Sequence, residues 1–220
     1  MAKRTREEEA ARLQGMLTYE EACYTRRIQG VTNAQTVCGV DEAGRGPLAG
    51  PVTAAAVILP RGLVIEGLDD SKKLSEKRRR ALFEVIQREA IAVSVVSISP
   101  RVIDDINILQ ATMRAMAAAV EGLSICPEYV LVDGNRLPPW TYDGEAIVGG
   151  DAKSMSIAAA SIIAKVTRDA LMVAYDAQYP GYGFAKHKGY GTKEHIEAIG
   201  AQGLTDIHRV SFCKREWGAK

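Results

Sequence analysis

Five short apolar runs, each closed by polar residues or glycine, predict five β-strands. They are rich in β-branched residues or alternate apolar with small side chains, which is typical of strands in a sheet. The runs span residues 37–40, 52–59, 91–98, 129–132 and 146–148. A loop with several glycines and prolines, residues 44–51, joins the first two runs, so we expect these two strands to pair.

Apolar residues at helical spacing predict four helices around these strands. The helices cover residues 4–28, 76–89, 108–120 and 154–175. Ser75 is placed to cap the second helix. The fourth contains no glycine or proline and many alanines, which favours a long helix with a small-residue packing face. The leading helix, followed by a polar linker at residues 30–35, is interpreted as an appendage to the core.

The composition of the chain is that of a soluble globular protein. Its 220 residues are 47% hydrophobic and 25% charged, which excludes a disordered, collagen-like or coiled-coil chain. No apolar run approaches the roughly 18 residues that span a bilayer, and the N-terminus lacks the apolar segment of a signal peptide. We therefore expect a cytoplasmic protein with no membrane association. The four cysteines are scattered without a CxxC pair, which indicates reduced thiols rather than zinc ligands or disulfides.

The charge balance of the chain conceals a basic segment. The 28 Lys and Arg residues against 27 Asp and Glu give a net charge of +1, which at first argues against a nucleic-acid partner. Residues 72–80, however, hold six cations and one acid. Such a run is commonly a solvated helix face, and this interpretation stays open for residues 77–80. The near-neutral total predicts modest non-specific affinity for nucleic acid without excluding binding.

Three of the predicted strands lead into acidic residues. The first runs into Asp41 and Glu42, the fourth into Asp133, and the fifth passes through two glycines into Asp151. Carboxylates that converge at the rim of a sheet repel each other unless a hard cation such as Mg²⁺ or Mn²⁺ neutralises them. Two such ions can activate a water and stabilise the leaving oxygen in phosphodiester cleavage. The four acids are therefore candidate metal ligands.

Each of these acids also has an ordinary structural interpretation. Asp133 followed by glycine is a common turn sequence. Asp151 stands where the N-cap of the long helix would lie, and Asp41 or Glu42 could cap a loop. Spacing alone does not show that the four side chains converge.

The motif around the first acids resembles a known family. Residues 39–51, with the sequence GVDEAGRGPLAGP, resemble the N-terminal signature of bacterial ribonuclease HII. Further segments that resemble this family in order and spacing are DSKKL at 70–74, DGN at 133–135, GDAKS at 150–154, and residues 158–169 and 182–192. The resemblance extends from about residue 17 to residue 212, and motifs of this length rarely agree by chance. The residues after 212 depart from it, because the family often has a proline there.

This resemblance implies an α/β fold, a ribonuclease H-like mixed five-stranded sheet flanked by helices, with a helical C-terminal extension. Residues 1–35 would form an N-terminal amphipathic helix and linker, residues 36–178 the catalytic core, and residues 179–220 an extension that contacts the substrate. The implied activity is endonucleolytic cleavage of the RNA strand of RNA-DNA hybrids and incision 5′ of single ribonucleotides embedded in duplex DNA. Two-metal-ion hydrolysis would leave 3′-hydroxyl and 5′-phosphate ends.

The resemblance also implies roles for individual residues. Carried over by position, it assigns catalysis and binding of Mg²⁺ or Mn²⁺, with a two-metal site, to Asp41, Glu42, Asp133 and Asp151. It assigns recognition of the ribonucleotide 2′-hydroxyl to the loop Gly44-Arg45-Gly46, because glycines let the backbone approach a sugar closely. Tyr190 matches a tyrosine that packs on the neighbouring deoxyribose. Judged without the resemblance, Arg45 would form a surface ion pair and Tyr190 would be a half-buried turn aromatic.

Basic and polar residues beside the matched motifs complete the expected substrate site. Phosphate contact is expected for Lys72, Lys73, Lys186 and Lys188. Ser154 could bind a phosphate or cap a helix.

The expected partners are RNA-DNA hybrids and ribonucleotide-containing duplex DNA, bound by a monomer that needs no obligate protein partner and no membrane. One alternative is a hybrid-binding module without cleavage, which the intact acid set disfavours because carboxylates repel phosphate unless metals intervene. Another is the related type 3 ribonuclease, which the Gly44-Arg45-Gly46 loop disfavours. His187, His195 and His208 lack the spacing of zinc ligands, so we expect them to form hydrogen bonds within the C-terminal extension.

Overall fold

The computed structural model describes residues 5–25, 27–28, 31–32 and 34–217. Its centre is a mixed five-stranded sheet with the order β5-β4-β3-β6-β7. These strands are β3 (Val37–Ala43), β4 (Val52–Ile58), β5 (Ala92–Ile98), β6 (Tyr129–Asp133) and β7 (Gly144–Ile147). Strands β5, β4 and β3 pair antiparallel, whereas β3, β6 and β7 run parallel. The five predicted strands and the expected mixed sheet are therefore confirmed.

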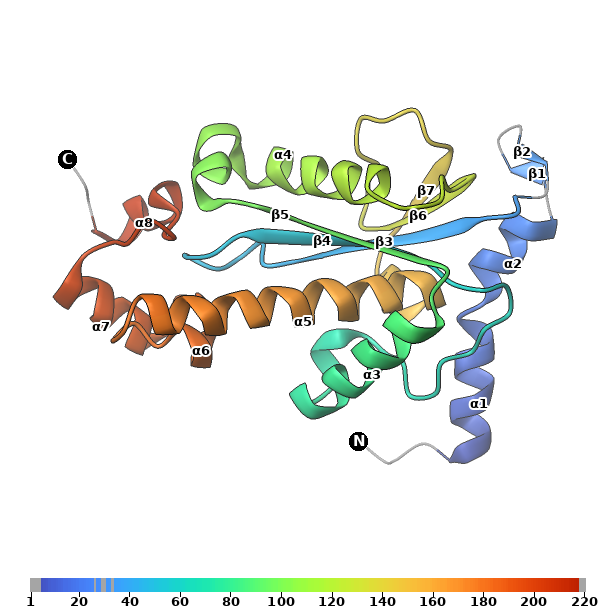
Figure 1. Ribbon diagram of the computed structural model, residues 1–220, viewed down its shortest axis with the longest axis horizontal. Helices are drawn as coiled ribbons and strands as arrows, with labels where there is room; N and C mark the ends of the chain where they lie inside the picture. The colour runs from blue at the N-terminus through green and yellow to red at the C-terminus, as the bar shows by residue number, and fades with distance from the viewer. Residues whose placement is uncertain (1–4, 26, 29–30, 33, 218–220) are drawn as a thin grey trace.

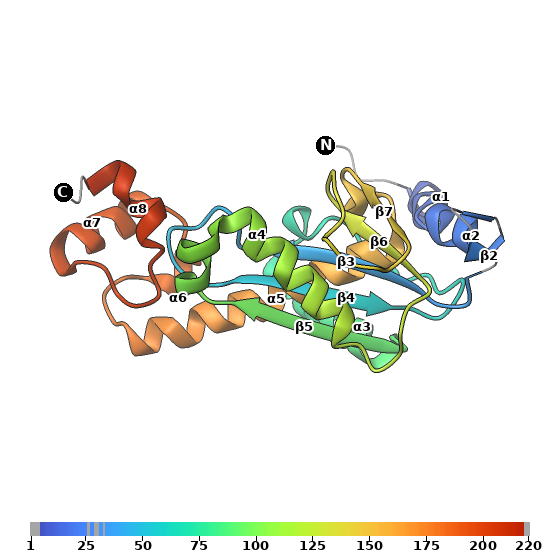
Figure 2. The ribbon, with the colours of Figure 1, turned by 90° about the horizontal axis from the view of Figure 1, so that it is seen from above.

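Helices cover both faces and both ends of this sheet. They are α1 (Arg6–Gly15), α2 (Thr18–Thr25), α3 (Glu76–Glu89), α4 (Pro100–Glu121), α5 (Met155–Gln178), α6 (Phe184–His187), α7 (Lys193–Gln202) and α8 (Val210–Trp217). Figure 1 shows α4 on one face and α5 with α3 on the other. The C-terminal helices lie at one end of the molecule and α1 and α2 at the opposite end, as Figure 2 also shows. Within the described residues, no helix is both long and apolar enough to span a bilayer.

The core forms where small residues let α4 and α5 approach the sheet. Every residue of β4 is buried, and its side chains alternate between the two faces. Ala55 and Val57 belong to the apolar cluster of α5, whereas Ala54 and Ala56 belong to that of α4. Strand β3 comes closer still, because a Cβ added at Gly39 would lie 2.1 Å from the carbonyl carbon of Ser156 in α5.

The N-terminal segment differs from its prediction. One helix over residues 4–28 was expected, but α1 ends at Gly15 and a separate helix α2 follows. Glycine is a poor helix former, and the Thr18 hydroxyl donates to the Gly15 carbonyl as the chain turns. Residues 27–28 then pair with β2 (Val31–Thr32) as the short strand β1 (Arg27–Ile28), so the expected helix and polar linker are both wrong there. Residues 4, 26, 30 and 33 of these predictions lie outside the described residues.

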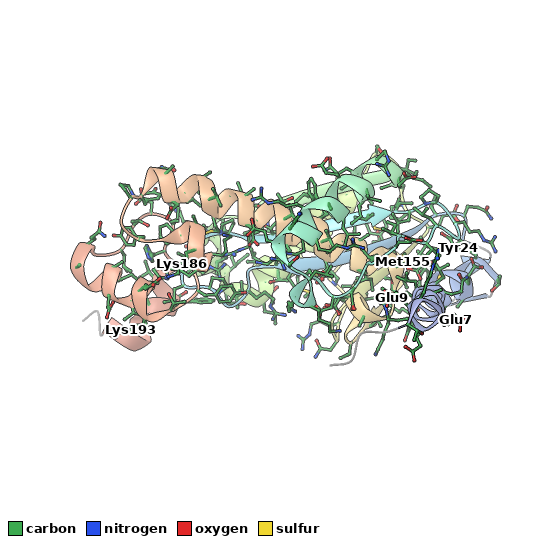
Figure 3. All side chains as sticks on the ribbon, turned by 90° about the horizontal axis from the view of Figure 1, so that it is seen from below. Glu7, Glu9, Tyr24, Met155, Lys186 and Lys193 are labelled. Carbon is green, nitrogen blue, oxygen red and sulfur yellow. The ribbon has the colours of Figure 1, made fainter. Side chains whose placement is uncertain are left out.

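Helices α1 and α2 pack against the core. Leu13, Met16 and Leu17 share an apolar cluster with the buried face of α5. The backbone N–H of Met155 donates to the Met16 carbonyl at 2.9 Å. Figure 3 shows Tyr24 and Met155 near each other at this end of the molecule, and both line one small cavity.

Two further element boundaries differ from the prediction for identifiable reasons. Helix α4 begins at Pro100, capped by Ser99, eight residues before the predicted start. Its chain kinks at Asn107, which has a φ of 67° and whose side chain accepts from Leu109 N and Gln110 N, so only the part after the kink was recognised. Strand β7 begins two residues earlier than predicted, because Gly144 pairs with Val130.

Candidate active site

The four predicted acids come from the carboxyl ends of three neighbouring parallel strands. The β3–β6 register pairs Val40 with Val132, which places Asp41 beside Asp133 one residue later. Asp133 ends β6, and its Oδ1 accepts a hydrogen bond of 2.7 Å from the Gly150 N–H. Asp151 lies in a 3₁₀ turn, Gly150–Ala152, that follows β7. The sheet therefore brings segments far apart in the sequence to one edge.

The structure resolves one alternative for Asp151. The N-cap of α5 is Ser154, whose side chain accepts from Ile157 N, so the helix-capping interpretation of Asp151 is wrong. Asp151 is 8% exposed and Asp41 is 5% exposed. Burying a carboxylate that does not cap a helix costs free energy of folding, which points to a chemical role for these residues.

Two clefts meet at this acidic edge. The cleft on the α5 side has a volume of about 170 Å³ and contains Asp41, Lys72, the 44–46 loop and Tyr190. The cleft on the α4 side has a volume of about 270 Å³ and contains Asp133. Glu42 lines both clefts. Asp41 and Glu42 can face different clefts because adjacent residues of a strand point to opposite faces.

Burial and neighbouring carboxylates raise the pKa values of Asp41, Glu42 and Asp151. Burial, followed by the charges of Glu42 and Asp133, raises the pKa of Asp41 well above its usual range. The pKa of Glu42 is also raised, chiefly by burial, although Arg45 and Lys72 oppose the shift. Burial and neighbouring carboxylates raise the pKa of Asp151 to about 6. The site thus concentrates negative charge that nearby cations only partly balance.

Lys72 is a cation close to Asp41 and Asp151 in this cluster. Burial lowers its pKa, but the nearby Asp151 and Asp41 outweigh burial, so the net pKa is raised. Its ammonium group therefore stays charged next to the acids. Lys73, in contrast, lies 3.5 Å from Asp69 and 3.8 Å from Asp70, and its side chain is 56% exposed.

The donor set matches a hard divalent cation by its chemistry. Carboxylate oxygens are the ligands that Mg²⁺ and Mn²⁺ prefer, and a cation would relieve the repulsion that raises these pKa values. As placed in the structure, no three His, Cys, Asp or Glu side chains of the described residues are grouped closely enough to hold a metal ion. The residues fit such an ion in type and charge.

Two buried arginines support the loop Gly44-Arg45-Gly46. Arg209 is fully buried and donates to the carbonyls of Gly44, Arg45 and Gly50 at 2.6 to 3.0 Å. Arg168 of α5, 1% exposed, donates to the carbonyls of Ala49, Pro51 and Lys188. Gly44 has a φ of 94°, and a Cβ there would lie 1.9 Å from Arg168 Nε, so the position requires glycine.

This support fixes the direction in which the loop presents its N–H groups. In a planar trans peptide the C=O and N–H point in opposite directions. The carbonyls of Gly44 and Arg45 point inward to Arg209, so the N–H groups of Arg45 and Gly46 point away from it. Two backbone donors are thereby oriented outward from the buried guanidinium.

Arg45 and Tyr190 lie at the mouth of the α5-side cleft. Arg45 Nη1 is 3.6 Å from Glu42 Oε1, and its side chain is 49% exposed, so the surface ion pair considered for it is present but weak. Tyr190 is 47% exposed and its ring lies against Gly46. The structure therefore brings the loop, Tyr190 and two of the four acids to one cleft.

The remaining predicted substrate residues lie outside this cleft. Lys186 forms an ion pair with Glu194 at the C-terminal end of the molecule, where Figure 3 shows it. Lys188 has a left-handed φ of 54° and lines a separate cleft between α3 and α5. Ser154 has no exposed surface and caps α5, as the second of its two interpretations expected. Its burial gives no support to a phosphate contact.

Two further residues of the site, Arg168 and Arg209, are not among the predicted ones. A signal for Arg168 was present, because it lies four residues after Ala164 and four before Met172 on the buried stripe of α5. A charge at such a position needs buried acceptors. Arg209 has no comparable signal, since it precedes a short helix.

The three histidines form a buried hydrogen-bonded group in the C-terminal extension, as expected. His195 Nε2 lies 3.1 Å from His208 Nε2, and His195 Nδ1 lies 2.9 Å from the Tyr190 carbonyl. His187 Nε2 is 2.8 Å from the Tyr182 carbonyl. Burial lowers the pKa of His208 to about 4. Burial also lowers the pKa of His195, so both His195 and His208 favour the neutral form, and His195 contacts the backbone at Tyr190.

Comparison with known proteins identifies close relatives. A family model described as Ribonuclease HII matches residues 38–215. A Ribonuclease HII of Acetivibrio thermocellus is 53% identical over 208 residues, covering 94% of this chain and 79% of the relative. One of Caldicellulosiruptor bescii is 57% identical over 178 residues, covering 81% of this chain and 86% of the relative.

Solved structures agree with this likeness. The crystal structure of ribonuclease H2 from Pyrococcus horikoshii OT3 superposes with a TM-score of 0.68 at 28% identity, covering 80% of this chain and 93% of that chain. Bst-RNase HIII, solved in complex with Mn²⁺, shares the fold with a TM-score of 0.61 at 17% identity, covering 96% of this chain and 72% of that chain.

Proposed function

Because the chain belongs to the ribonuclease HII family, we propose that it is an endoribonuclease that cuts the RNA strand of RNA-DNA hybrids. We further propose that it incises duplex DNA 5′ of a single embedded ribonucleotide, leaving 3′-hydroxyl and 5′-phosphate ends. The observation that carries the proposal of ribonucleotide incision is one cleft that contains the buried Asp41, the half-buried Glu42, the oriented Gly44-Arg45-Gly46 loop and the exposed ring of Tyr190. The acids suit the chemistry, and the loop and ring suit the selection of one sugar.

Asp41, Glu42, Asp133 and Asp151 are the residues that would hold divalent cations. When bound there, one or two Mg²⁺ or Mn²⁺ ions supply the activation of a water and the neutralisation of charge on the leaving oxygen. Without a cation these carboxylates would repel the substrate phosphate. Lys72, which already faces Asp151 and Asp41, adds positive charge on the side where a phosphate would approach.

The loop and Tyr190 act on the sugars. The outward N–H groups of Arg45 and Gly46 can donate to a 2′-hydroxyl, the group that distinguishes RNA from DNA. The exposed guanidinium of Arg45 can donate to a phosphate. The Tyr190 ring beside Gly46 offers a flat apolar surface to the next sugar, which favours a deoxyribose without the polar 2′-hydroxyl.

The remaining proposals concern the setting of this activity. The substrates are RNA-DNA hybrids and ribonucleotide-containing duplex DNA, which the protein would meet in the cytoplasm. We propose that it acts as a monomer without an obligate protein partner. Size-exclusion chromatography with light scattering tests the monomer, and a mass near 23.8 kDa is expected.

The central experiment incubates the protein with duplex DNA that contains one ribonucleotide, in Mg²⁺, Mn²⁺ or EDTA. A metal-dependent nick 5′ of the ribonucleotide is expected, and all-DNA duplex of the same sequence is the control. Arg45→Ala and Tyr190→Ala should lose cleavage of this substrate more than cleavage of a continuous hybrid. Arg136→Ala, in the α4-side cleft, is the matched control and should affect both substrates alike. Absence of any nick rejects the proposal, and equal losses at Arg45 and Tyr190 reject the selection mechanism.

A further inference from the structure

Helix α2 buries a carboxylate that the proposed chemistry does not use. Glu20 is 6% exposed, although it lies near the N-terminal end of the chain. Its Oε1 accepts three hydrogen bonds, from the hydroxyls of Ser154 and Ser156 at 2.6 Å and from Ser156 N–H at 3.0 Å. Its Oε2 is buried and has no hydrogen-bond partner. A half-satisfied buried carboxylate is destabilising, so its presence calls for a reason beyond packing.

The partners of Glu20 form the first turn of α5. Ser154 is the N-cap of this 24-residue helix, and Ser156 lies in its first turn. A negative charge at a helix N-terminus is favourable, because it meets N–H groups that lack partners inside the helix. Glu20 therefore acts as an additional cap, supplied by another helix.

This capped turn is continuous with the acidic edge. Ser154 N–H donates to the Gly150 carbonyl at 2.8 Å, and Gly150 N–H donates to Asp133 Oδ1 at 2.7 Å. Asp151 lies within the turn that these bonds close. A chain of hydrogen bonds thus runs from Glu20 through Ser154 and Gly150 to one candidate metal ligand and encloses another.

The same turn is also where α5 meets the strand of the other two acids. A Cβ at Gly39 of β3 would lie 2.1 Å from the Ser156 carbonyl carbon, so the two backbones are in direct contact. A shift of Ser156 would therefore be transmitted to β3, which carries Asp41 and Glu42 two and three residues later. All three acid-bearing segments contact the turn that Glu20 holds.

We propose that Glu20 is a positioning residue for the active site, which fixes Asp151 and Asp133 through the first turn of α5. This assigns a positioning role to α2, which lies before residue 38, where the family model begins to match. The inference rests on the proposed function, because it concerns the reaction at those acids. Residues behind metal ligands commonly change activity or metal affinity by 10- to 100-fold when they are replaced, and Glu20, which lies further out, should give about tenfold.

The test compares Glu20→Leu, Glu20→Gln and Ser156→Ala with two controls. Leucine removes the acceptor, glutamine keeps an acceptor oxygen, and Ser156→Ala removes one donor with little change in volume. Glu21→Gln makes the same chemical change at an exposed neighbour that pairs with Arg61. Leu13→Ala weakens the packing of α1 on α5 without touching the hydrogen-bond chain.

We would measure turnover of a saturating RNA-DNA hybrid over a series of Mg²⁺ concentrations, at a temperature where every variant is folded. The series gives kcat and the Mg²⁺ concentration of half-maximal activity, the Mg²⁺ midpoint. Glu20→Leu and Ser156→Ala should lower kcat or raise the Mg²⁺ midpoint about tenfold, and Glu20→Gln should recover most of the loss. Both controls should behave as the unmodified protein does. Unchanged kinetics in Glu20→Leu and Ser156→Ala, or an equal loss in Leu13→Ala, would overturn the proposal.

Hydrogen exchange followed by mass spectrometry tests the positioning without substrate or metal. Amides of residues 150–156 should exchange faster in Glu20→Leu than in Glu21→Gln, and equal exchange would overturn the proposal. This separates the two ideas. If the unmodified protein cleaves no hybrid, the proposed function fails, whereas the exchange measurement still decides whether Glu20 holds the turn.

Discussion

Replacement of Arg209 by methionine tests how the Gly44-Arg45-Gly46 loop is held. Methionine keeps much of the length and apolar contact of the arginine side chain but donates no hydrogen bond. The substitution deprives the carbonyls of Gly44, Arg45 and Gly50 of the guanidinium. Of these three residues only Gly50 is buried, so water can replace the guanidinium at the other two carbonyls.

The effect on stability follows from these exposures. One buried carbonyl without a donor costs about 1–3 kcal/mol. Burial, and then the charge of Arg168, lower the pKa of Arg209 to about 9, so the folded protein holds this charge at a disadvantage that methionine removes. We expect a net loss of at most about 3 kcal/mol, and each kcal/mol lowers Tm by about 2–4 °C in a chain of this size.

The effect on activity should depend on the substrate, whereas the effect on stability does not. Without Arg209 the peptide groups of Arg45 and Gly46 can rotate, so their N–H groups lose the direction argued above. A misplacement of about 1 Å costs on the order of a hundredfold in rate. That loss is expected for duplex DNA with one ribonucleotide, and a smaller one for a continuous hybrid. Single-turnover cleavage of both substrates, well below Tm, measures the ratio.

Ile86→Ala is the control for this prediction. Ile86 is fully buried on α3, and its truncation costs about 2–5 kcal/mol, a loss of similar or larger size than that expected at Arg209. It makes no contact with the loop's hydrogen bonds, so the ratio between the two substrates should stay unchanged. An equal loss on both substrates in Arg209→Met, or the same shift of the ratio in Ile86→Ala, would refute the reasoning.

Three further predictions concern the acids and the loop. The raised pKa of Asp151 means that the folded state binds its proton more tightly than the unfolded state, so metal-free protein should gain stability as pH falls from about 6 toward 3.8. Urea unfolding at a series of pH values measures this gain in stability, and the gain should be smaller in Asp151→Asn. The same variant should also lose most turnover. Differential scanning fluorimetry should show that saturating Mg²⁺ raises the Tm of the unmodified protein. The rise should be smaller in Asp41→Asn. Gly44→Ala should cost more than about 1 kcal/mol and abolish selection. Gly62→Ala, at another positive φ but in open space, should cost less, and equal urea midpoints would contradict the clash.

The sheet and the four acids could be predicted from sequence because their signals are local. Each predicted strand is a run of three to eight mainly apolar residues, and an acid that closes such a run is expected at the edge of the sheet. The ambiguity at Asp151 was of a different kind. Both it and Ser154 are good capping residues within four positions, and only the hydrogen bond from Ile157 N to Ser154 decides between them.

The contacts that escaped prediction join segments distant in sequence. Nothing near Arg209 in the chain shows that its acceptors are carbonyls about 160 residues earlier. The break at Gly15 was missed because the apolar residues on both sides keep a roughly helical spacing, so periodicity alone gave one helix. In the sequence, Glu20 resembles any acidic residue on the exposed face of a helix. It is buried only by tertiary packing.

The long sequence separation between the parts of the site also has a consequence for folding. Asp41 meets Asp133 only when β6 docks beside β3, and Gly44 is held only when Arg209, 165 residues later, has folded back beneath it. Such distant contacts form late, because chain entropy opposes them until most of the protein is ordered. A partly folded or unfinished chain would therefore carry β3 and its acids without nuclease activity. Hydrolytic activity and the proposed sugar selection should then emerge together, as the last contacts of the fold close.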